Sequence, residues 1–138
     1  MKLINVRGRE VNVGVSKYSI DWDSKSASQL QTDAKRFFRP YWIGMVVLEE
    51  FRIPGSLLRC DFVNLTKKLV VEINGGQHGE FNKFFHGNRT GYLQSIRRDY
   101  TKLKWSENNG FTFIEIEEKE VAILTPDFFR QKFGVELV

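Results

Sequence analysis

Cysteine, proline and histidine are scarce in this chain of 138 residues, which has one cysteine, three prolines and two histidines. The single cysteine, Cys60, excludes an internal disulfide and fits a reducing compartment such as the cytoplasm. No apolar run approaches the roughly 20 residues that a membrane-spanning helix needs, and the first residues lack the apolar core of a signal peptide. These absences predict a cytoplasmic protein with no membrane partner.

Hydrophobic residues make up 41% of the chain and include twelve phenylalanines and three tryptophans, enough for a substantial core. The length fits one domain, and no low-complexity linker interrupts it. We expect a single domain over residues 23–138. Residues 1–22 alternate weakly around Arg7-Gly8-Arg9, which predicts an N-terminal hairpin or extended arm.

The main domain is predicted to begin with a helix and three strands. Ser26 is the expected N-cap of the helix, with Gln29 as its capping-box partner, and the helix should end before Pro40. The strands are expected over residues 45–53, 57–63 and 69–73. Their connections are too short for a helical crossover, which predicts an antiparallel meander.

The second half of the chain is predicted to hold a helix, a strand and a short helix. The helix over residues 92–108 should bury one face, formed by Leu93, Ile96, Tyr100 and Leu103. The strand over 111–116 follows this helix, so it should pair parallel to a central strand. A final helix over 127–133 should have Thr125 as N-cap. The order α-β-β-β-α-β predicts an α/β fold with a mixed central sheet flanked by helices.

Two acidic residues interrupt the predicted meander. Asp61 lies in the second strand, and Glu72 follows the apolar run Leu69-Val70-Val71 of the third. A carboxylate in a buried strand costs several kcal/mol unless it is compensated, and one Mg²⁺ ion can compensate two. The pair therefore indicates metal-assisted hydrolysis. In the alternative, Asp61 is an exposed strand residue in a salt bridge, and Glu72 forms a buried ion pair with Arg98 or Lys102. Cys60, next to Asp61, should be buried on the opposite face of its strand.

Basic residues gather in the segment after the acidic pair. The net charge of +4 and the pI near 9.3 fit a polyanionic partner, although many proteins without one are mildly basic. The distribution is more informative, because the C-terminal part is acidic and offsets this segment in the total. The candidate phosphate contacts are Lys83, Arg89, Arg97, Arg98 and Lys102.

Four short motifs occur in the order found in the PD-(D/E)XK nuclease superfamily: Asp61-Phe62, residues 71–78 (Val-Glu-Ile-Asn-Gly-Gly-Gln-His), Arg98-Asp99 and Asn109-Gly110-Phe111. The chain resembles the Vsr-like branch of that superfamily over residues 26–118, and it is also similar to the EDxHD homing-endonuclease variant. The resemblance implies a restriction-endonuclease-like core.

The resemblance also implies roles for individual residues. Asp61 and Glu72, with the carbonyl of Ile73, would hold Mg²⁺, for which Mn²⁺ substitutes. His78 would act as general base or orient the attacking water, which suits an imidazole that titrates near neutrality. Asp99 would orient His78 or bind the metal through water.

Two positions depart from the superfamily pattern. Asn74 stands where the motif lysine is expected, and part of the role of that lysine falls to Gln77, His78, Arg98 or Lys102. Gln29 replaces the acid of the first helix. Glu49 or Glu50 would substitute for that acid; since the two alternate, only one faces the site, and Glu50 is preferred.

These features predict a Mg²⁺-dependent DNA endonuclease that makes one nick per active site. A compact nuclease of this kind would suit a phage or mobile element in the cytoplasm of a bacterial or phage-infected host cell. Residues 1–22 would serve as a dimerisation arm. A nuclease-fold protein that binds nucleic acid without cutting it is the alternative that Asn74 and Gln29 favour. A third reading is an α/β interaction protein with no nucleic-acid role.

Overall fold

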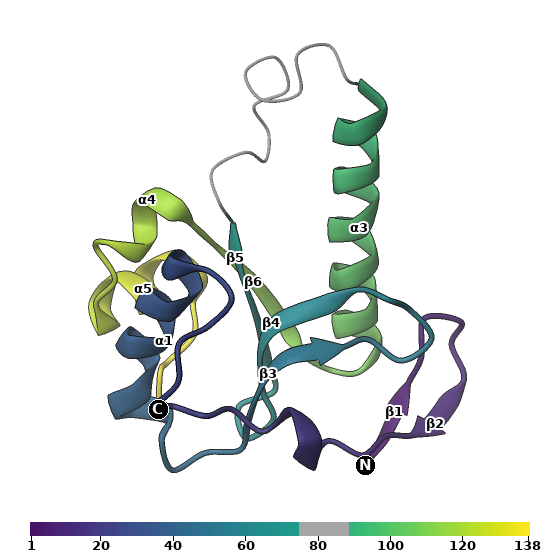
Figure 1. Cartoon of the computed structure of the whole chain (residues 1–138), viewed down its shortest axis with the longest axis horizontal. Coiled ribbons are helices and arrows are strands. Elements are labelled where there is room, and N and C mark those ends of the chain that lie inside the picture. Colours follow the sequence, from purple (N-terminus) through teal and green to yellow (C-terminus); the bar gives the residue numbers. More distant parts are fainter. Residues whose placement is uncertain (75–88) are drawn as a thin grey trace.

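The computed structural model describes residues 1–74 and 89–138 and shows a mixed α/β protein (Figure 1). The main sheet has four strands in the order β3-β4-β5-β6. They are β3 (Val47–Arg52), β4 (Arg59–Asn64), β5 (Leu69–Asn74) and β6 (Thr112–Glu117). The helices are α1 (Gln29–Trp42), α3 (Arg89–Asn108), α4 (Glu118–Val121) and α5 (Pro126–Phe133). No helix in the described ranges is long and apolar enough to cross a membrane.

The topology of the sheet follows from the lengths of its connections. Strands β3, β4 and β5 pair antiparallel in chain order. Strand β6 enters after α3 and pairs parallel to β5, from Leu69↔Thr112 to Asn74↔Glu117. A parallel partner needs a crossover of a dozen or more residues, which α3 supplies. The predicted meander with one added parallel strand is therefore confirmed.

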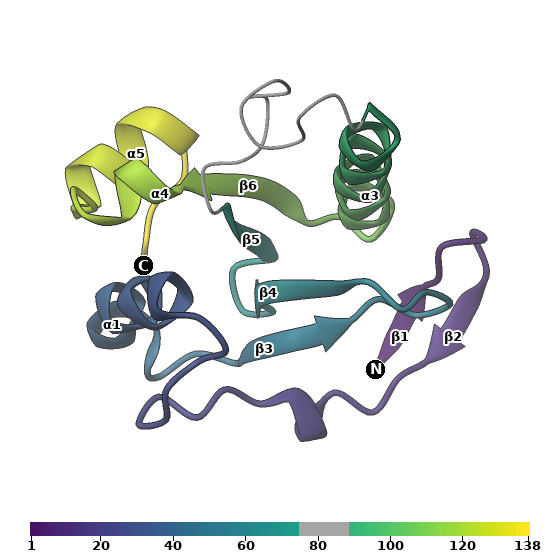
Figure 2. The same ribbon diagram turned by 45° about the horizontal axis from the view of Figure 1, so that its top comes forward.

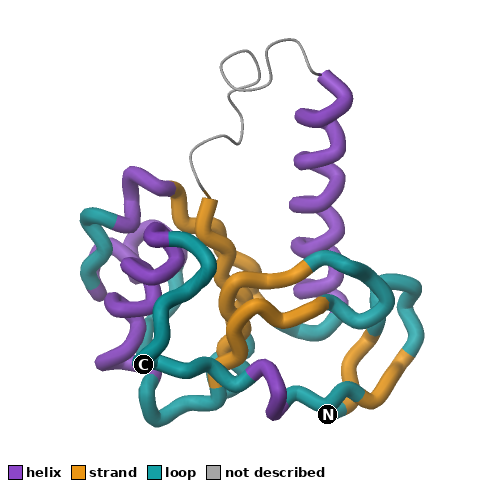
Figure 3. The backbone as a smooth tube through the Cα atoms, in the orientation of Figure 1, coloured by secondary structure: helices purple, strands orange, loops and turns teal. Residues whose placement is uncertain are grey.

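Each face of the sheet is covered by its own hydrophobic core. Helices α1, α4 and α5 lie on one side of the strands and α3 on the other (Figures 2 and 3). The core on the α1 side includes Phe38, Phe62 and Val71, and the core on the α3 side includes Val70 and Trp105. Full burial of each such side chain contributes roughly 1.5–3 kcal/mol. Alternation along β5 thus divides its side chains between two cores.

The N-terminal hairpin predicted within residues 1–22 is confirmed and consists of β1 (Lys2–Ile4) and β2 (Glu10–Asn12), followed by the 3-10 helix η1 (Ser16–Tyr18). Gly8, in the turn, has a φ of +82° that favours glycine. The hairpin packs on the rest of its own chain. Leu3 lies in the α3-side core, and the Val6 N–H donates to the Pro54 carbonyl at 3.0 Å. Dimerisation through this arm stays a prediction.

Helix α1 differs from its prediction at both ends. Ser28, rather than Ser26, is the N-cap and accepts a hydrogen bond from the Gln31 N–H. The helix also runs through Pro40 to Trp42. A proline inside a helix costs about 3 kcal/mol, and the packing of Trp42 offsets that cost. Its ring is fully buried, stacks on Phe38 at 4.0 Å and donates to the Leu137 carbonyl at 2.8 Å.

The second half of the chain mixes confirmed and wrong predictions. Thr125 caps α5 as expected, accepting from the Phe128 N–H at 3.0 Å. The sequence analysis did not predict the short α4, which begins with a capping box between Glu117 and Glu120. The expected apolar face of α3 is wrong in its first half, because that half extends beyond the sheet (Figure 1). The exposed apolar side chains there are Leu93 (46%) and Ile96 (47%), and Tyr100, just past the middle of the helix, is also exposed (61%).

Candidate active site

The two predicted acids lie where the β4–β5 ladder ends. Backbone pairing stops at Phe62↔Val71. Beyond that pair, carboxylate side chains accept the hydrogen bonds of the backbone N–H groups. The Asp61 N–H donates to Glu72 Oε2 at 2.7 Å, and the Ile73 N–H donates to Asp61 Oδ2 at 2.8 Å. Each carboxylate therefore satisfies a backbone donor of the neighbouring strand. This exchange fixes both acids side by side at the end of the ladder.

Strand β4 is irregular at Asp61. Residues two apart on a regular strand face the same side, yet Cys60 lies in the α3-side core and Phe62 in the α1-side core. Cys60 is fully buried as expected. The expectation that it lies on the face opposite Asp61 is wrong, because Cys60 is in the α3-side core and Asp61 lines the cleft beside α3. The neighbouring carboxylates Glu72 and Asp61 then add to the burial that raises the pKa of its thiol.

Lys102 of α3 reaches the acidic pair and forms an ion pair with Glu72. Glu72 is buried, at 6% exposure, and Val70, two residues before it, lies in the α3-side core. The alternation of β5 therefore turns Glu72 toward α3. The ion pair is the alternative that the sequence left open for Glu72. Lys102 and Arg98 are four residues apart, so they share one face of the helix.

The electrostatics of the site follow from burial. Burial raises the pKa of Asp61 to about 7, with the Glu72 charge adding to the shift. Burial also raises the pKa of Glu72, although Lys102 opposes the shift. Burial alone would lower the pKa of Lys102, but the Glu72 carboxylate leaves it above its ordinary value. The Lys102 ammonium is paired with Glu72, and the buried carboxyl of Asp61 lies beside that pair.

The backbone separates Glu49 from Glu50. Glu49 turns to α1, where it accepts from Lys35 Nζ at 2.9 Å and from Gln31 Nε2 at 2.8 Å. Glu50 has a φ of +52°, a conformation that costs a non-glycine residue about 1–3 kcal/mol. The pairs on either side, Glu49↔Phe62 and Phe51↔Cys60, place it opposite Asp61. Its charge contributes to the raised pKa of Asp61.

A cleft of about 390 Å³ opens over the acidic pair. Helix α3 contributes Arg98, Asp99 and Lys102 to it, and the charge of Asp99 adds to the raised pKa of Glu72. Arg59, at the start of β4, also lines the cleft and is missing from the sequence-based candidates. Its position two residues before Asp61 is the signal that could have found it. Leu57 and Leu58 form the apolar part of the wall.

Among the remaining predicted residues, only Arg97 has a described side chain. Arg97 is exposed on α3 and does not line the cleft. Gln77, His78 and Lys83 fall outside the described residues, and the side chain of Arg89 is likewise not described.

The two departures from the superfamily pattern have clear partners. Asn74, at the position of the motif lysine, is buried and donates to Glu115 of β6. Gln29 lies on the exposed surface of α1 and donates to Asp33 Oδ1 at 2.8 Å. Asn74 lines the same cleft as the acidic pair, but its amide nitrogen donates to β6. The cation beside Glu72 therefore comes from α3, not from β5.

The donor set of the pair fits a hard divalent cation. Carboxylate oxygens are the ligands that Mg²⁺ prefers, and Mg²⁺ is commonly bound by one or two carboxylates with water completing the shell. A divalent cation would offset the burial that raises the pKa of both carboxyls. Within residues 1–74 and 89–138, no group of three or more His, Cys, Asp or Glu side chains could hold a metal ion. Among the described residues, the Ile73 carbonyl, which the resemblance implies as a ligand, belongs to the strand that carries Glu72.

Comparison with known proteins gives a match to a viral protein. Over 64 residues the chain is 41% identical to the "Uncharacterized protein 033L" of Invertebrate iridescent virus 3. The matched stretch covers 46% of this chain and 33% of the viral protein, so the chain matches about a third of that protein's length. No protein-family model matches the chain, and no solved structure matches it.

Proposed function

We propose that this protein is a Mg²⁺-dependent DNA endonuclease in which Asp61 and Glu72 hold the metal. The reciprocal hydrogen bonds between these carboxylates and the backbone of the opposite strand carry the proposal. They keep two desolvated acids together in a cleft that Arg59, Arg98 and Lys102 also line, an arrangement that suits a divalent cation and an anionic substrate. The four-stranded mixed sheet agrees with the restriction-endonuclease-like core that the resemblance implies.

Each residue near the acids has a role in this proposal. The Ile73 carbonyl would join Asp61 and Glu72 as a metal ligand. Bound there, Mg²⁺ would supply the positive charge that stabilises negative charge developing on the phosphate. Lys102 would donate to a phosphate oxygen and so take the part of the motif lysine that Asn74 lacks. Arg59 and Arg98 would hold flanking phosphates. His78, with Gln77 beside it, stays the expected base or orienting group for water.

A second candidate function is nucleic-acid binding without cleavage. The ion pair between Lys102 and Glu72 favours it, because an ammonium already compensates one of the two acids. Strand β5 also has no lysine for catalysis, since Asn74 stands at that position and donates to Glu115. Both functions use the same cleft, and they differ in whether the acids bind metal.

Nicking of supercoiled plasmid separates the two functions. The reaction is run with Mg²⁺ or Mn²⁺ and with EDTA, using the wild type, Asp61→Asn and Glu72→Gln. Glu107→Gln, at an exposed acid of α3, is the matched control. Nicking that needs metal, persists in the control and is lost in both site variants supports the endonuclease. A folded wild type that binds the plasmid in a gel but leaves it uncut with either metal favours the binding function.

A further inference from the structure

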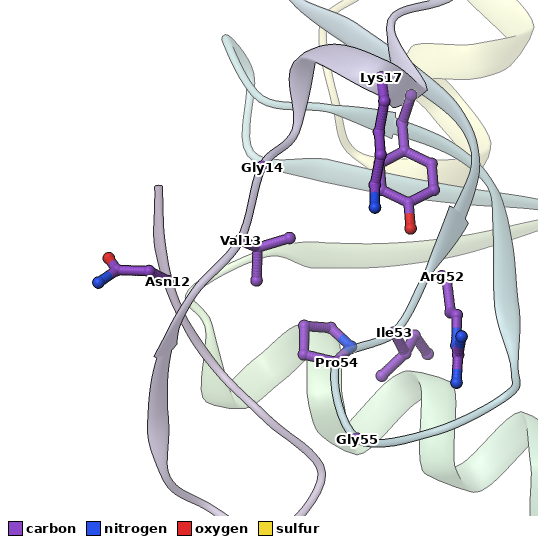
Figure 4. Close-up of a pocket in the computed structure, with 9 residues that line it drawn as sticks. Asn12, Val13, Gly14, Lys17, Arg52, Ile53, Pro54 and Gly55 are labelled. Carbon is purple, nitrogen blue, oxygen red and sulfur yellow. The ribbon is translucent and has the colours of Figure 1, made fainter.

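A second cleft shares the β3–β4 turn with the candidate active site. It has a volume of about 280 Å³, and residues 52–55 form one wall. The other wall comes from the segment that follows the N-terminal hairpin, with Asn12, Val13, Gly14, Lys17 and Tyr18 (Figure 4). The active-site cleft begins only two residues further along the turn, at Leu57, Leu58 and Arg59. The two clefts are therefore neighbours on one hairpin.

The cationic side chains of the second cleft are held by the fold. Arg52 Nε donates to the Ser56 carbonyl at 2.8 Å, which fixes the plane of its guanidinium. Lys17 Nζ lies 5.3 Å from the centre of the Tyr18 ring, and that ring packs edge-on against Phe51 at 4.9 Å. No aspartate or glutamate lines the cleft, and no carboxylate within the described residues pairs with Arg52 or Lys17. The cleft thus carries two cationic side chains and no lining carboxylate.

Arg52 and Arg59 join the two clefts. They are directly opposite each other in the β3–β4 ladder, and both are exposed. Like charges directly opposite on neighbouring strands destabilise a sheet. Arg52 lines the second cleft and Arg59 lines the active-site cleft. Consecutive backbone phosphates of one nucleic acid would remove the repulsion, because a different phosphate could neutralise each arginine.

We propose that the Lys17–Arg52 cleft binds a backbone phosphate of DNA that flanks the one at the active site. The proposal rests on the proposed function for the identity of the polyanion. It assigns the segment from Asn12 to Tyr18 to the DNA-binding surface. Contacts of this kind position a duplex and carry no sequence information. The site should therefore strengthen binding to all sequences alike.

The test measures binding in the absence of cleavage. Anisotropy of a short fluorescein-labelled DNA duplex is recorded in EDTA, in an Asp61→Asn background, at several salt concentrations. We expect Lys17→Gln and Arg52→Gln each to weaken binding several-fold and to lower the slope of log K against log salt by about one unit. Arg52→Lys should retain most of the slope, since it keeps the charge. Lys119→Gln, at an exposed lysine of α4, is the matched control.

The outcomes separate this proposal from the proposed function. Unchanged affinity and slope in both Lys17→Gln and Arg52→Gln would overturn the phosphate site and leave the endonuclease in place. A lower slope in both variants, combined with a wild type that does not cut, would support the phosphate site and favour the binding function. A wild type without salt-dependent DNA binding would overturn both proposals. Loss of binding in Lys119→Gln to the same extent would show a general charge effect and overturn the specific site.

Discussion

Asp61 and Glu72 each accept a hydrogen bond from the backbone of the other's strand, at 2.8 Å and 2.7 Å respectively. They thereby replace the ladder bonds that β4 and β5 would otherwise form at this point. The carboxylate oxygens that could hold a metal therefore also complete the hydrogen bonding between β4 and β5. Substitutions here should therefore alter stability as well as activity, and the two effects can be separated by pH and by isosteric amides.

Asp61→Asn should change the pH dependence of stability. The pKa of Asp61 rises on folding from 3.8 to about 7, so the folded state binds this proton more tightly than the unfolded state. The contribution to stability is present below pH 4 and is lost as the pH rises through 7. We expect the Asp61→Asn variant to be more stable than the wild type at pH 8, by on the order of 1–2 kcal/mol, and similar to it at pH 4. Urea unfolding without metal measures this. Equal stability of the two proteins at pH 8 would contradict the buried charge.

Lys102→Met should destabilise the protein most at alkaline pH. The change leaves Glu72 buried without its cation, which costs about 3 kcal/mol. Below the raised pKa of Glu72 the acid is protonated, so the cost should shrink as the pH falls. Adding Glu72→Gln to Lys102→Met should restore most of the lost stability. Urea unfolding of the two single variants and the double variant measures the coupling, and additive losses would contradict the ion pair.

Glu50→Gly should stabilise the fold. The φ of +52° at Glu50 is strained for an L side chain and costs glycine little. The change also removes a negative charge beside Asp61. We expect a gain in the free energy of unfolding on the order of 1 kcal/mol. Glu50→Gln, which removes the charge but keeps the strain, is the control that separates the two contributions. If urea unfolding finds the Glu50→Gly variant less stable than the Glu50→Gln variant, the strain at this position is contradicted.

Cys60 should resist thiol reagents in the folded protein. Burial raises the pKa of its thiol, which leaves little thiolate to react. The rate of labelling with a chromogenic disulfide should therefore follow the rate or extent of unfolding. We expect the reaction to accelerate sharply across the urea transition. Rapid labelling in native buffer, without loss of structure, would contradict the packing of Cys60 at full burial.

The topology of the sheet could be predicted because local signals agree with it. Dense apolar runs with short connections define the three antiparallel strands, and α3 leaves β6 only the parallel position. The C-terminal end of α1 could not be predicted from the residues around it. Pro40 signals a stop, but the burial of Trp42 decides the outcome, and that burial is a tertiary property. The predicted burial of one face of α3 was wrong for the same reason, because residue spacing does not show how far a helix extends beyond a sheet.

The acids of the site could be predicted, and their surroundings only in part. Asp61 and Glu72 stand out as charges in apolar strands. The preference for Glu50 over Glu49 stays a prediction; Glu49 contacts Lys35 of α1, and Glu50, opposite Asp61, has a positive φ that no sequence pattern shows. Lys102 is 30 residues from Glu72 in the chain, so its contact is set by the packing of α3. Arg59 became a candidate only through its pairing with Arg52, which depends on the register of β3 and β4 in the folded sheet.

Metal binding tests the proposed site at Asp61 and Glu72 most directly, because plasmid nicking also depends on offering the right substrate. Calorimetric titration of the wild type with Mn²⁺ at pH 8 should show one bound ion. Binding should be lost or strongly weakened in Asp61→Asn and in Glu72→Gln, and retained in Glu107→Gln. Saturating metal should also raise the stability of the wild type, by about 2.7 kcal/mol at one hundred times the Kd. A folded wild type that binds no Mn²⁺, or binds it equally in all three variants, would contradict a metal site at Asp61 and Glu72.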